Sequence, residues 1–319
     1  ARAAEYEGDA LTHASEVDRA LRLDPEFWPA LADRAWVRSD SGKARAALAD
    51  LEAAPEEPVA LQALTAYARP GPFTAARNER CPCGSDLKHK LCCGLHNGYP
   101  LSLRALWLYW KAMWFASRPA QRAAIEQQVE AVLETVESDT TGGVDSFFLA
   151  GLFAENHVVQ AIATFEGGVL QRFRDERRLV LPADEADLLD QWLGARHRLL
   201  RIEEWIEDVD VLLRDLVTGE TLVVVGPLLD RKFSQGDVFA APVLFSGEEP
   251  CVLGWSTVPE SVDTLRDAMV AGDPDALLRY VLEERVAATS QALGQFDPAM
   301  RDRESWLLPP ASSPLNGMP

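Results

Sequence analysis

Apolar residues recur at helical spacing through much of the chain between residues 100 and 195. The clearest example is one face formed by Leu103, Trp107, Trp110 and Trp114. Other apolar residues widen this surface to most of the circumference, which favours a buried core helix; an exposed aromatic ridge that binds a partner is the alternative. The same periodicity predicts helices over residues 103–115, 120–137, 147–165 and 184–193.

The pattern changes near residue 197, where short runs of β-branched and apolar residues alternate with turn residues. Thr218-Gly219-Glu220 and Ser246-Gly247-Glu248-Glu249 are typical of hairpin turns. Strands are therefore predicted over residues 199–205, 209–216, 221–225, 238–245 and 251–255. Five antiparallel strands of this length favour a small barrel of the SH3 or OB kind. Two helices, residues 261–271 and 273–285, are predicted to follow the barrel.

Residues 1–70 contain two related segments. Three pairs of matching residues stand 34 positions apart: Gly8 and Gly42, Val17 and Leu51, Ala20 and Ala54. The small residues of the third pair let paired helices approach closely. This period resembles that of the tetratricopeptide repeat, and the resemblance implies helical hairpins. Stacked repeats need about three units or a cap, so we expect either further helices before Ala1 or a cap formed by the next domain.

Four of the five cysteines lie within thirteen residues, as Cys81-Pro82-Cys83 and Cys92-Cys93. Zinc binds four thiolates in a tetrahedron, and a Cys-x-Cys pair can place two thiolates on one tight turn. The eight residues that follow bring the second pair back to the same point, and Gly94 lets the backbone bend just after it. We interpret residues 77–94, called the knuckle below, as a closed all-sulfur metal site. Iron in place of zinc and a pair of disulfides are the alternatives.

The knuckle closely resembles the SEC-C motif, which is best known from the C-terminal tail of the preprotein translocase ATPase SecA and occurs in many unrelated bacterial proteins. The match includes Arg77-Asn78, the run Cys81-Pro82-Cys83-Gly84-Ser85 and the final Cys92-Cys93-Gly94, while Asp86 stands where the family usually has glycine. The resemblance implies structural zinc and a small surface for protein partners, and it implies no activity. The implied zinc ligands are Cys81, Cys83, Cys92 and Cys93, and the basic residues of the partner surface are Arg77, Arg80, Lys88 and Lys90.

The sequence contains no recognisable catalytic signature. None of the five histidines belongs to an H-E-x-x-H pair or a nucleophile constellation, and no glycine-rich phosphate loop occurs. His89 and His96 flank the cysteines and are expected to be surface groups or neighbours of the ligands. Cys251 is expected to be a small core residue. A solvated helix face is predicted for the acidic run Asp184, Glu185, Asp187 and Asp190. We therefore expect a protein that is not an enzyme, and an unrecognised active site is the alternative.

The net charge of −19 is unevenly distributed. Residues 1–70 carry −5, residues 71–99 carry +2 and the remainder carries −16. Broad adhesion to a nucleic-acid backbone is disfavoured, because only the knuckle region is basic. Even there, the cations could simply neutralise the formal −2 charge of zinc with four thiolates. A nucleic-acid-binding barrel is the alternative, and it would have to stack bases on Trp205, Phe239, Phe245 and Trp255. The acidic residues Glu203, Glu204, Asp208 and Asp210 crowd the same edge.

These patterns predict an α+β multidomain protein. Its predicted parts are tetratricopeptide-like repeats in residues 1–70, the zinc knuckle region in 71–99, a helical domain in 100–195, a small antiparallel β-barrel with two helices in 196–290, and a flexible tail in 291–319. No apolar run is long enough to span a membrane, and thiol chemistry points to the reducing cytoplasm. The predicted function is a zinc-binding adaptor for protein partners, for which the resemblance suggests a secretion chaperone such as SecB or the ribosome.

Overall fold

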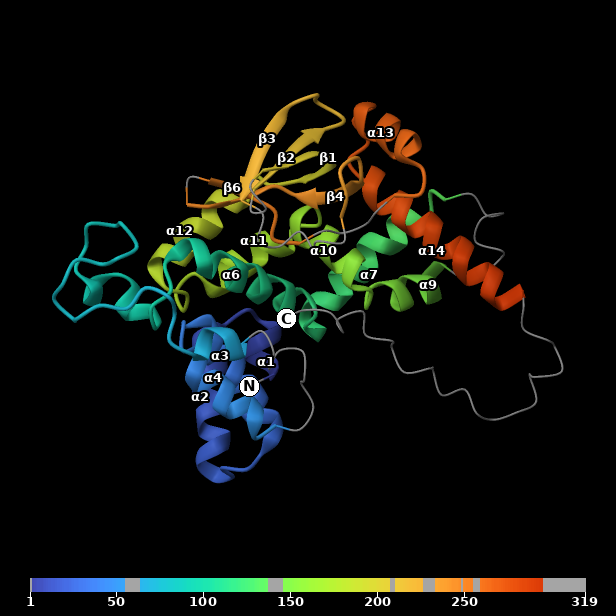
Figure 1. The fold of residues 1–319 in the computed structure, drawn as a ribbon. Helices are drawn as coiled ribbons and strands as arrows, with labels where there is room; N and C mark the ends of the chain where they lie inside the picture. Colours follow the sequence, from blue (N-terminus) through green and yellow to red (C-terminus); the bar gives the residue numbers. More distant parts are fainter. Residues whose placement is uncertain are drawn as a thin grey trace.

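The computed structural model describes residues 2–54, 64–136, 146–206, 210–225, 233–247, 249–254 and 259–294. Helices and one sheet make up the part of the chain that the structure describes, so the mixed α and β class is confirmed (Figure 1). None of the described helices is long and apolar enough to cross a bilayer.

The N-terminal part contains the described helices α1 (Arg2–Tyr6), α2 (Ala10–Leu23), α3 (Trp28–Asp40) and α4 (Ala44–Glu52), and residues 64–68 are helical as well. Gly8 and Gly42 stand before α2 and α4 with φ of +73° and +75°, a left-handed conformation that glycine adopts at little cost. The repeated glycine therefore marks the same turn twice. The assignment of these helices to the tetratricopeptide family stays a prediction.

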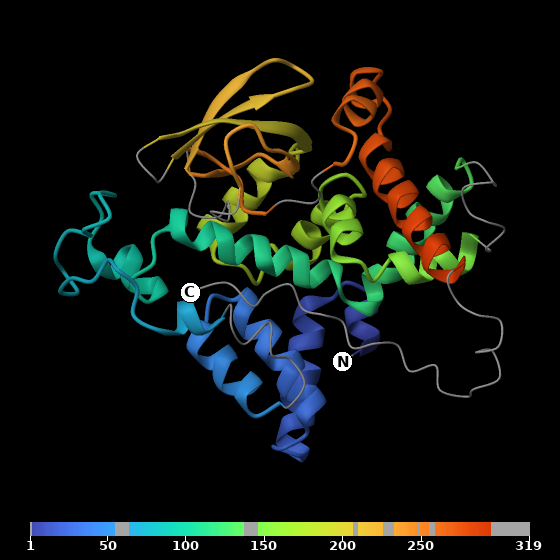
Figure 2. The same ribbon diagram turned by 45° about the vertical axis from the view of Figure 1, so that its right-hand side comes forward.

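Helix α6 (Leu101–Ala116) lies between the N-terminal helices and the rest of the molecule, as Figures 1 and 2 both show. Its Trp107 is buried, stacks on Tyr67 with ring centroids 4.9 Å apart, and donates a hydrogen bond from Nε1 to Ser39 Oγ at 3.1 Å. Its opposite side packs into the largest apolar core through Leu108 and Ala112. The core-helix interpretation is therefore confirmed, and Trp107 holds the N-terminal helices to this core.

The remaining helices surround α6 and complete this core. They are α7 (Pro119–Leu133), α9 (Ser146–Phe153), α10 (His157–Phe165), α11 (Val169–Arg177), α12 (Ala183–Trp192), α13 (Val262–Val270) and α14 (Ala276–Gly294). Helix α11 was not predicted; it begins directly after Gly168, which has φ of +77°. Helix α14 extends through the first residues of the predicted tail, and the rest of that tail lies outside the described residues.

Among the described residues, six strands form a single sheet in the order β4-β1-β2-β3-β6-β5. They are β1 (His197–Ile206), β2 (Asp210–Asp215), β3 (Thr221–Val225), β4 (Val238–Pro242), β5 (Leu244–Ser246) and β6 (Glu249–Cys251). The pairs are antiparallel except β3 with β6, which is parallel. Buried Cys251 lies on β6, as expected of a small core residue.

The predicted closed barrel was wrong, because the described strands form an open sheet with β4 and β5 at its edges. One predicted strand, residues 238–245, is divided into these two, which belong to opposite edges of the sheet. The division falls at Pro242, the last residue of β4, where the missing N–H interrupts strand pairing. Only Val243 lies between the two strands, so the sheet curves until its two edges come close together at this point, although no pairing between β4 and β5 closes it in the described strands.

The aromatic residues of the nucleic-acid alternative do not form a common exposed face in the described part of the sheet. Phe239 is fully buried and packs against Phe233, and Trp205 is partly buried against the same core. Phe245 is exposed on β5. Trp255 and Asp208 lie outside the described residues. Phe239 is therefore unavailable for stacking on a base.

Candidate metal centre

A short hairpin carries the first cysteine pair. Arg80 and Lys88 form an isolated antiparallel bridge, Cys81 N–H donates to Leu87 O at 2.7 Å, and His89 N–H donates to Glu79 O at 2.8 Å. Two single-turn helices follow, η1 (His89–Leu91) and η2 (Cys93–His96), with Cys92 between them. These turns return the chain to the first pair and bring all four cysteines to one place.

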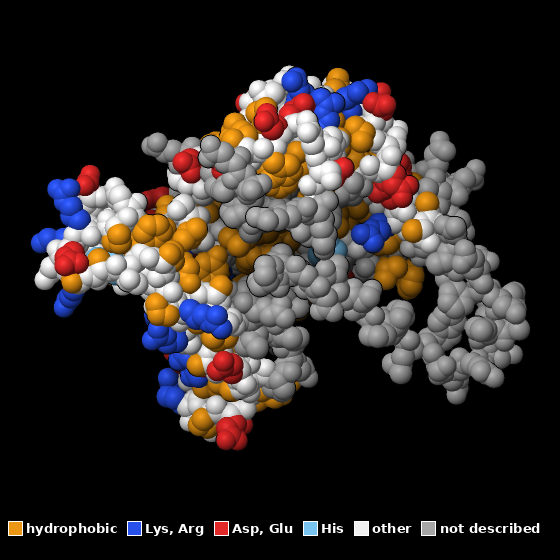
Figure 3. Space-filling view, viewed as in Figure 1, with side chains coloured by type: hydrophobic (Ala, Val, Ile, Leu, Met, Phe, Trp, Pro, Cys, Tyr) orange, Lys and Arg blue, Asp and Glu red, His pale blue; other side chains and the backbone are white. Residues whose placement is uncertain are grey.

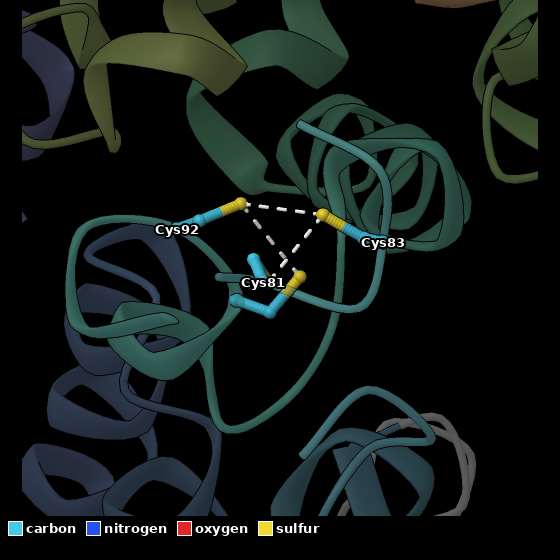
Figure 4. Close-up of side chains that lie close together, drawn as sticks. Cys81, Cys83 and Cys92 are labelled. Carbon is cyan, nitrogen blue, oxygen red and sulfur yellow. Dashed lines mark hydrogen bonds between the residues drawn. The ribbon is translucent and has the colours of Figure 1, made fainter. Parts of the chain in front are cut away.

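The four sulfur atoms lie within 4.8 Å of one another. Cys83 Sγ is 3.4 Å from both Cys81 Sγ and Cys92 Sγ, and Cys92 Sγ is 3.9 Å from Cys93 Sγ. Four thiolates placed about 2.3 Å from one zinc ion are about 3.8 Å apart at the corners of a tetrahedron. Figure 4 shows the sulfurs of Cys81, Cys83 and Cys92 directed toward one another. The cluster can hold one metal ion, and its four cysteines are free rather than bridged in disulfides.

Neighbouring side chains contact these sulfurs and change the pKa values of the thiols. Ser85 Oγ donates to Cys92 Sγ at 3.1 Å, and His89 Nδ1 lies 3.7 Å from Cys81 Sγ. Burial opposes ionisation of Cys83, but hydrogen bonds with Ser85 and the adjacent thiols outweigh it and lower the pKa of Cys83 to about 6. Burial raises the pKa values of Cys92 and Cys93. A metal ion must displace the protons of the thiols that it binds, so acidification weakens metal binding.

Three tight backbone positions shape the knuckle. Gly84 has φ of +87° and Asp86 has φ of +57°, so both adopt left-handed conformations. Asp86 thus fits a position where the related motif has glycine, because aspartate tolerates this region better than most residues. Gly94 is needed for a different reason: a Cβ there would lie 2.5 Å from His89 O. Its role is close approach of two backbone segments rather than a bend.

Substitution of Gly94 by alanine is expected to disrupt the metal site. The added methyl group forces η1 and η2 apart and thereby displaces Cys92 and Cys93. We expect at least a tenfold loss of zinc affinity, equal to about 1.4 kcal/mol. Competition with a chromogenic chelator measures this. Asp86→Gly is the matched control, because it preserves the left-handed turn and removes only an exposed pair with Arg80. Equal affinities for the two variants would contradict this account of Gly94.

The knuckle is fixed to the body at its base. Gly71 N–H donates to Asn97 O at 2.7 Å, and Phe73 N–H donates to Gly98 O at 3.1 Å. The side chain of Asn97 donates to three consecutive carbonyls at residues 67–69, and Tyr99 Oη donates to Ala66 O at 2.6 Å. These bonds tie together the two chain segments that enter and leave the knuckle, and Arg104 Nε of α6 donates to Tyr99 O of the second segment at 3.3 Å. The knuckle projects from the body in a defined direction (Figure 1).

Basic side chains gather at the outer end of the projecting knuckle (Figure 3), and the four basic residues of this region are those predicted for partner binding. Arg77, Arg80 and Lys88 are exposed and Lys90 is half-buried. Arg80 pairs with Asp86 at 3.1 Å, and none of the other three makes an ion pair with a described residue. Three cations are therefore available to a partner or to the charge of the metal–thiolate cluster.

A buried charge network lies beneath the knuckle, and the sequence interpretation missed it. Glu185 on α12 was expected on a solvated face but is fully buried, where it accepts hydrogen bonds from Arg104 and from Lys111 Nζ, the latter at 2.6 Å. Arg104 also pairs with Asp184, whose carboxylate lies 3.8 Å from His96 Nε2. Only Asp187 of the acidic run is largely solvated. The network joins α12 to α6 and reaches η2 through His96.

The comparison with known families agrees with this geometry. A family model described as the SEC-C motif matches residues 77–95. No curated protein and no solved structure matches the chain. The match confirms the resemblance of the knuckle to the SEC-C motif and does not extend to the helices or the sheet. A cysteine cluster of this family, placed in this geometry, indicates metal binding.

Proposed function

We propose that this protein is a zinc-binding, non-enzymatic adaptor whose knuckle is a docking surface for other proteins. The observation that carries the proposal is the convergence of four thiols within 4.8 Å inside a segment of SEC-C type. Cys81, Cys83, Cys92 and Cys93 would hold the ion. Four thiolates fill a tetrahedron and leave no position for water or substrate, so the ion would stabilise shape rather than catalyse.

The partner surface would include Arg77, Arg80, Lys88 and Lys90. Support comes from their position at the outer end of a rigidly based knuckle, where a partner can approach without contact with the acidic body. A secretion chaperone and the ribosome are the partner classes that the motif suggests, and any contact with nucleic acid would be confined to the knuckle. Reduced thiols fit a cytoplasmic location.

Loss of the metal ligands is expected to remove the partners. Affinity purification with quantitative mass spectrometry would compare the partners of the intact protein with those of the double variant Cys92→Ser/Cys93→Ser. Elemental analysis would measure the zinc content of both. We expect about one zinc per intact protein and a partner set that the double variant loses. Cys251→Ala is the control, because Cys251 lies in the sheet and far along the chain from the cluster. Partners that persist in the double variant would transfer the binding function to the repeats or the sheet.

A further inference from the structure

A large cleft separates the knuckle from the body. Its volume is about 1310 Å³, and five parts of the chain line it: the knuckle, the turn between α3 and α4, the start of α6, the loop between α11 and α12 with the start of α12, and Gly247 after β5. Tyr99, Pro100 and Leu101 lie where the knuckle joins α6. The cleft exceeds the roughly 300–1,000 Å³ typical of small-molecule sites. Its size therefore suits a segment of polypeptide rather than a metabolite.

The knuckle side of the cleft is apolar although it faces solvent. Leu87, Leu91 and Leu95 line the cleft with 49%, 56% and 65% of their surfaces exposed. Val180 and Pro182 lie among the residues of the loop between α11 and α12 that line it. Figure 3 shows apolar side chains gathered between the projecting knuckle and the body. Exposed apolar surface concentrated in one concave region is typical of sites that bind other polypeptides.

Charge at the cleft favours carboxylates over cations in the bound segment. Lys43 lines the cleft, Lys88 and Lys90 stand next to the leucines in sequence, and none of the three makes an ion pair with a described residue. Asp184 is the acidic side chain of the lining, and Arg104 holds it. Zinc with four thiolates would offset the net charge of +2 in residues 71–99, which leaves Lys43 as the cation with no local counter-charge.

We propose that this cleft binds an amphipathic segment of a partner polypeptide. Leucine or aromatic side chains of the segment would pack on Leu87, Leu91 and Leu95, and carboxylates on its polar side would meet Lys43. The inference rests on the proposed adaptor function and assigns it a site and a class of partner. The inference places the main contact with the partner on the apolar inner side of the knuckle rather than on its basic outer end.

The cleft has a preset width because both of its sides are tied to α6. On the knuckle side, Arg104 Nε of α6 donates to Tyr99 O at 3.3 Å, and on the body side the start of α12 is held by the pairing of Asp184 with the same Arg104. His96, which follows the last cysteines, lies 3.8 Å from the same Asp184. A segment that enters the cleft therefore meets a preformed site, which reduces the entropy lost on binding.

The probe is a fluorescein-labelled helical peptide of about four turns, with leucines on one face and glutamates on the other. A peptide with the same composition in scrambled order tests the need for an amphipathic arrangement, and a version with lysine in place of glutamate tests charge. Fluorescence anisotropy with the zinc-loaded full chain measures affinity. We expect the acidic amphipathic peptide to bind at least tenfold more tightly than the scrambled and lysine versions at about 0.15 M salt.

Protein variants locate the binding site. The double variant Leu91→Glu/Leu95→Glu is expected to weaken binding by about ten- to a hundredfold. Each substitution removes an apolar contact with the peptide and introduces a carboxylate that repels the glutamates of the peptide. Leu23→Glu is the matched control, since Leu23 is 81% exposed on the N-terminal helices and lies outside the cleft. Zinc content and thermal melting confirm that both variants are folded.

Two results would overturn the inference. The first is no binding of the acidic peptide at about 100 μM protein, or binding that Leu91→Glu/Leu95→Glu leaves unchanged. The second is concentration-dependent self-association of the intact protein that these substitutions abolish, which would assign the leucines to a contact between copies of this chain. In either case, the cleft would be excluded as the binding site. The adaptor function would still stand if the Cys92→Ser/Cys93→Ser variant loses its partners.

Discussion

Removal of the metal by a chelator is expected to unfold the knuckle and leave the helices and the sheet folded. Within residues 77–94 only Cys81 and Cys93 are buried, so apart from its sulfur cluster the knuckle has no core of its own. Structural zinc contributes about 10–16 kcal/mol in zinc-finger peptides, far more than the few hydrogen bonds of this hairpin supply. The body keeps large apolar cores that do not include the cysteines of the cluster.

Hydrogen exchange followed by mass spectrometry measures this result. Amides of the hairpin, such as those of Cys81 and His89, are protected by backbone hydrogen bonds and should exchange freely after chelation. Gly71, which donates to Asn97 O at the base, should keep its protection, because that contact belongs to the body. Zinc added back under reducing conditions should restore the hairpin. Protection that persists without metal, or loss of protection throughout the chain, would contradict a separate metal-dependent unit.

The metal centre could be predicted from sequence because every part of it is local. All four sulfurs come from thirteen consecutive residues, and the spacing of the cysteines alone limits how they can meet. Even the departure at Asp86 is explained by local backbone conformation, since its φ of +57° is one that aspartate tolerates. The helix over residues 103–115 was likewise clear from its periodicity. Neither feature depends on a distant segment.

Features that depend on distant segments were harder to predict. The open sheet depends on how the chain turns at Pro242, and strand periodicity does not say whether the sheet closes. Burial of Glu185 depends on Arg104 and Lys111, which precede it by more than seventy residues. A signal for that burial was present: Arg104 and Lys111 stand seven residues apart, on one face of an otherwise apolar helix. Two cations on a buried face require a carboxylate from elsewhere.

Replacement of Glu185 by alanine is expected to destabilise the protein by about 3–5 kcal/mol, the cost of leaving buried charge without its partner. Lys111 would be the more affected cation, because its remaining contacts are Asp40 O at 3.4 Å and the ring of Trp107 at 4.3 Å. Arg104 would still pair with Asp184. This loss is a large fraction of the free energy of unfolding of a typical domain, which is about 5–15 kcal/mol. Urea denaturation followed by circular dichroism measures the loss.

Two further variants separate uncompensated charge from simple loss of packing. Asp187→Ala on the same helix is the matched control, because 75% of the Asp187 side chain is exposed and its cost should stay below about 0.5 kcal/mol. Lys111→Met combined with Glu185→Leu removes both charges and keeps the volume, so it should recover most of the lost stability. If the double variant were no more stable than Glu185→Ala, the uncompensated charge of Lys111 would not be the cause of the lost stability. If it recovers, the cost of Glu185→Ala comes from the charge left on Lys111 without its partner, and apolar packing of the same volume holds α12 against α6, and with it the body side of the cleft.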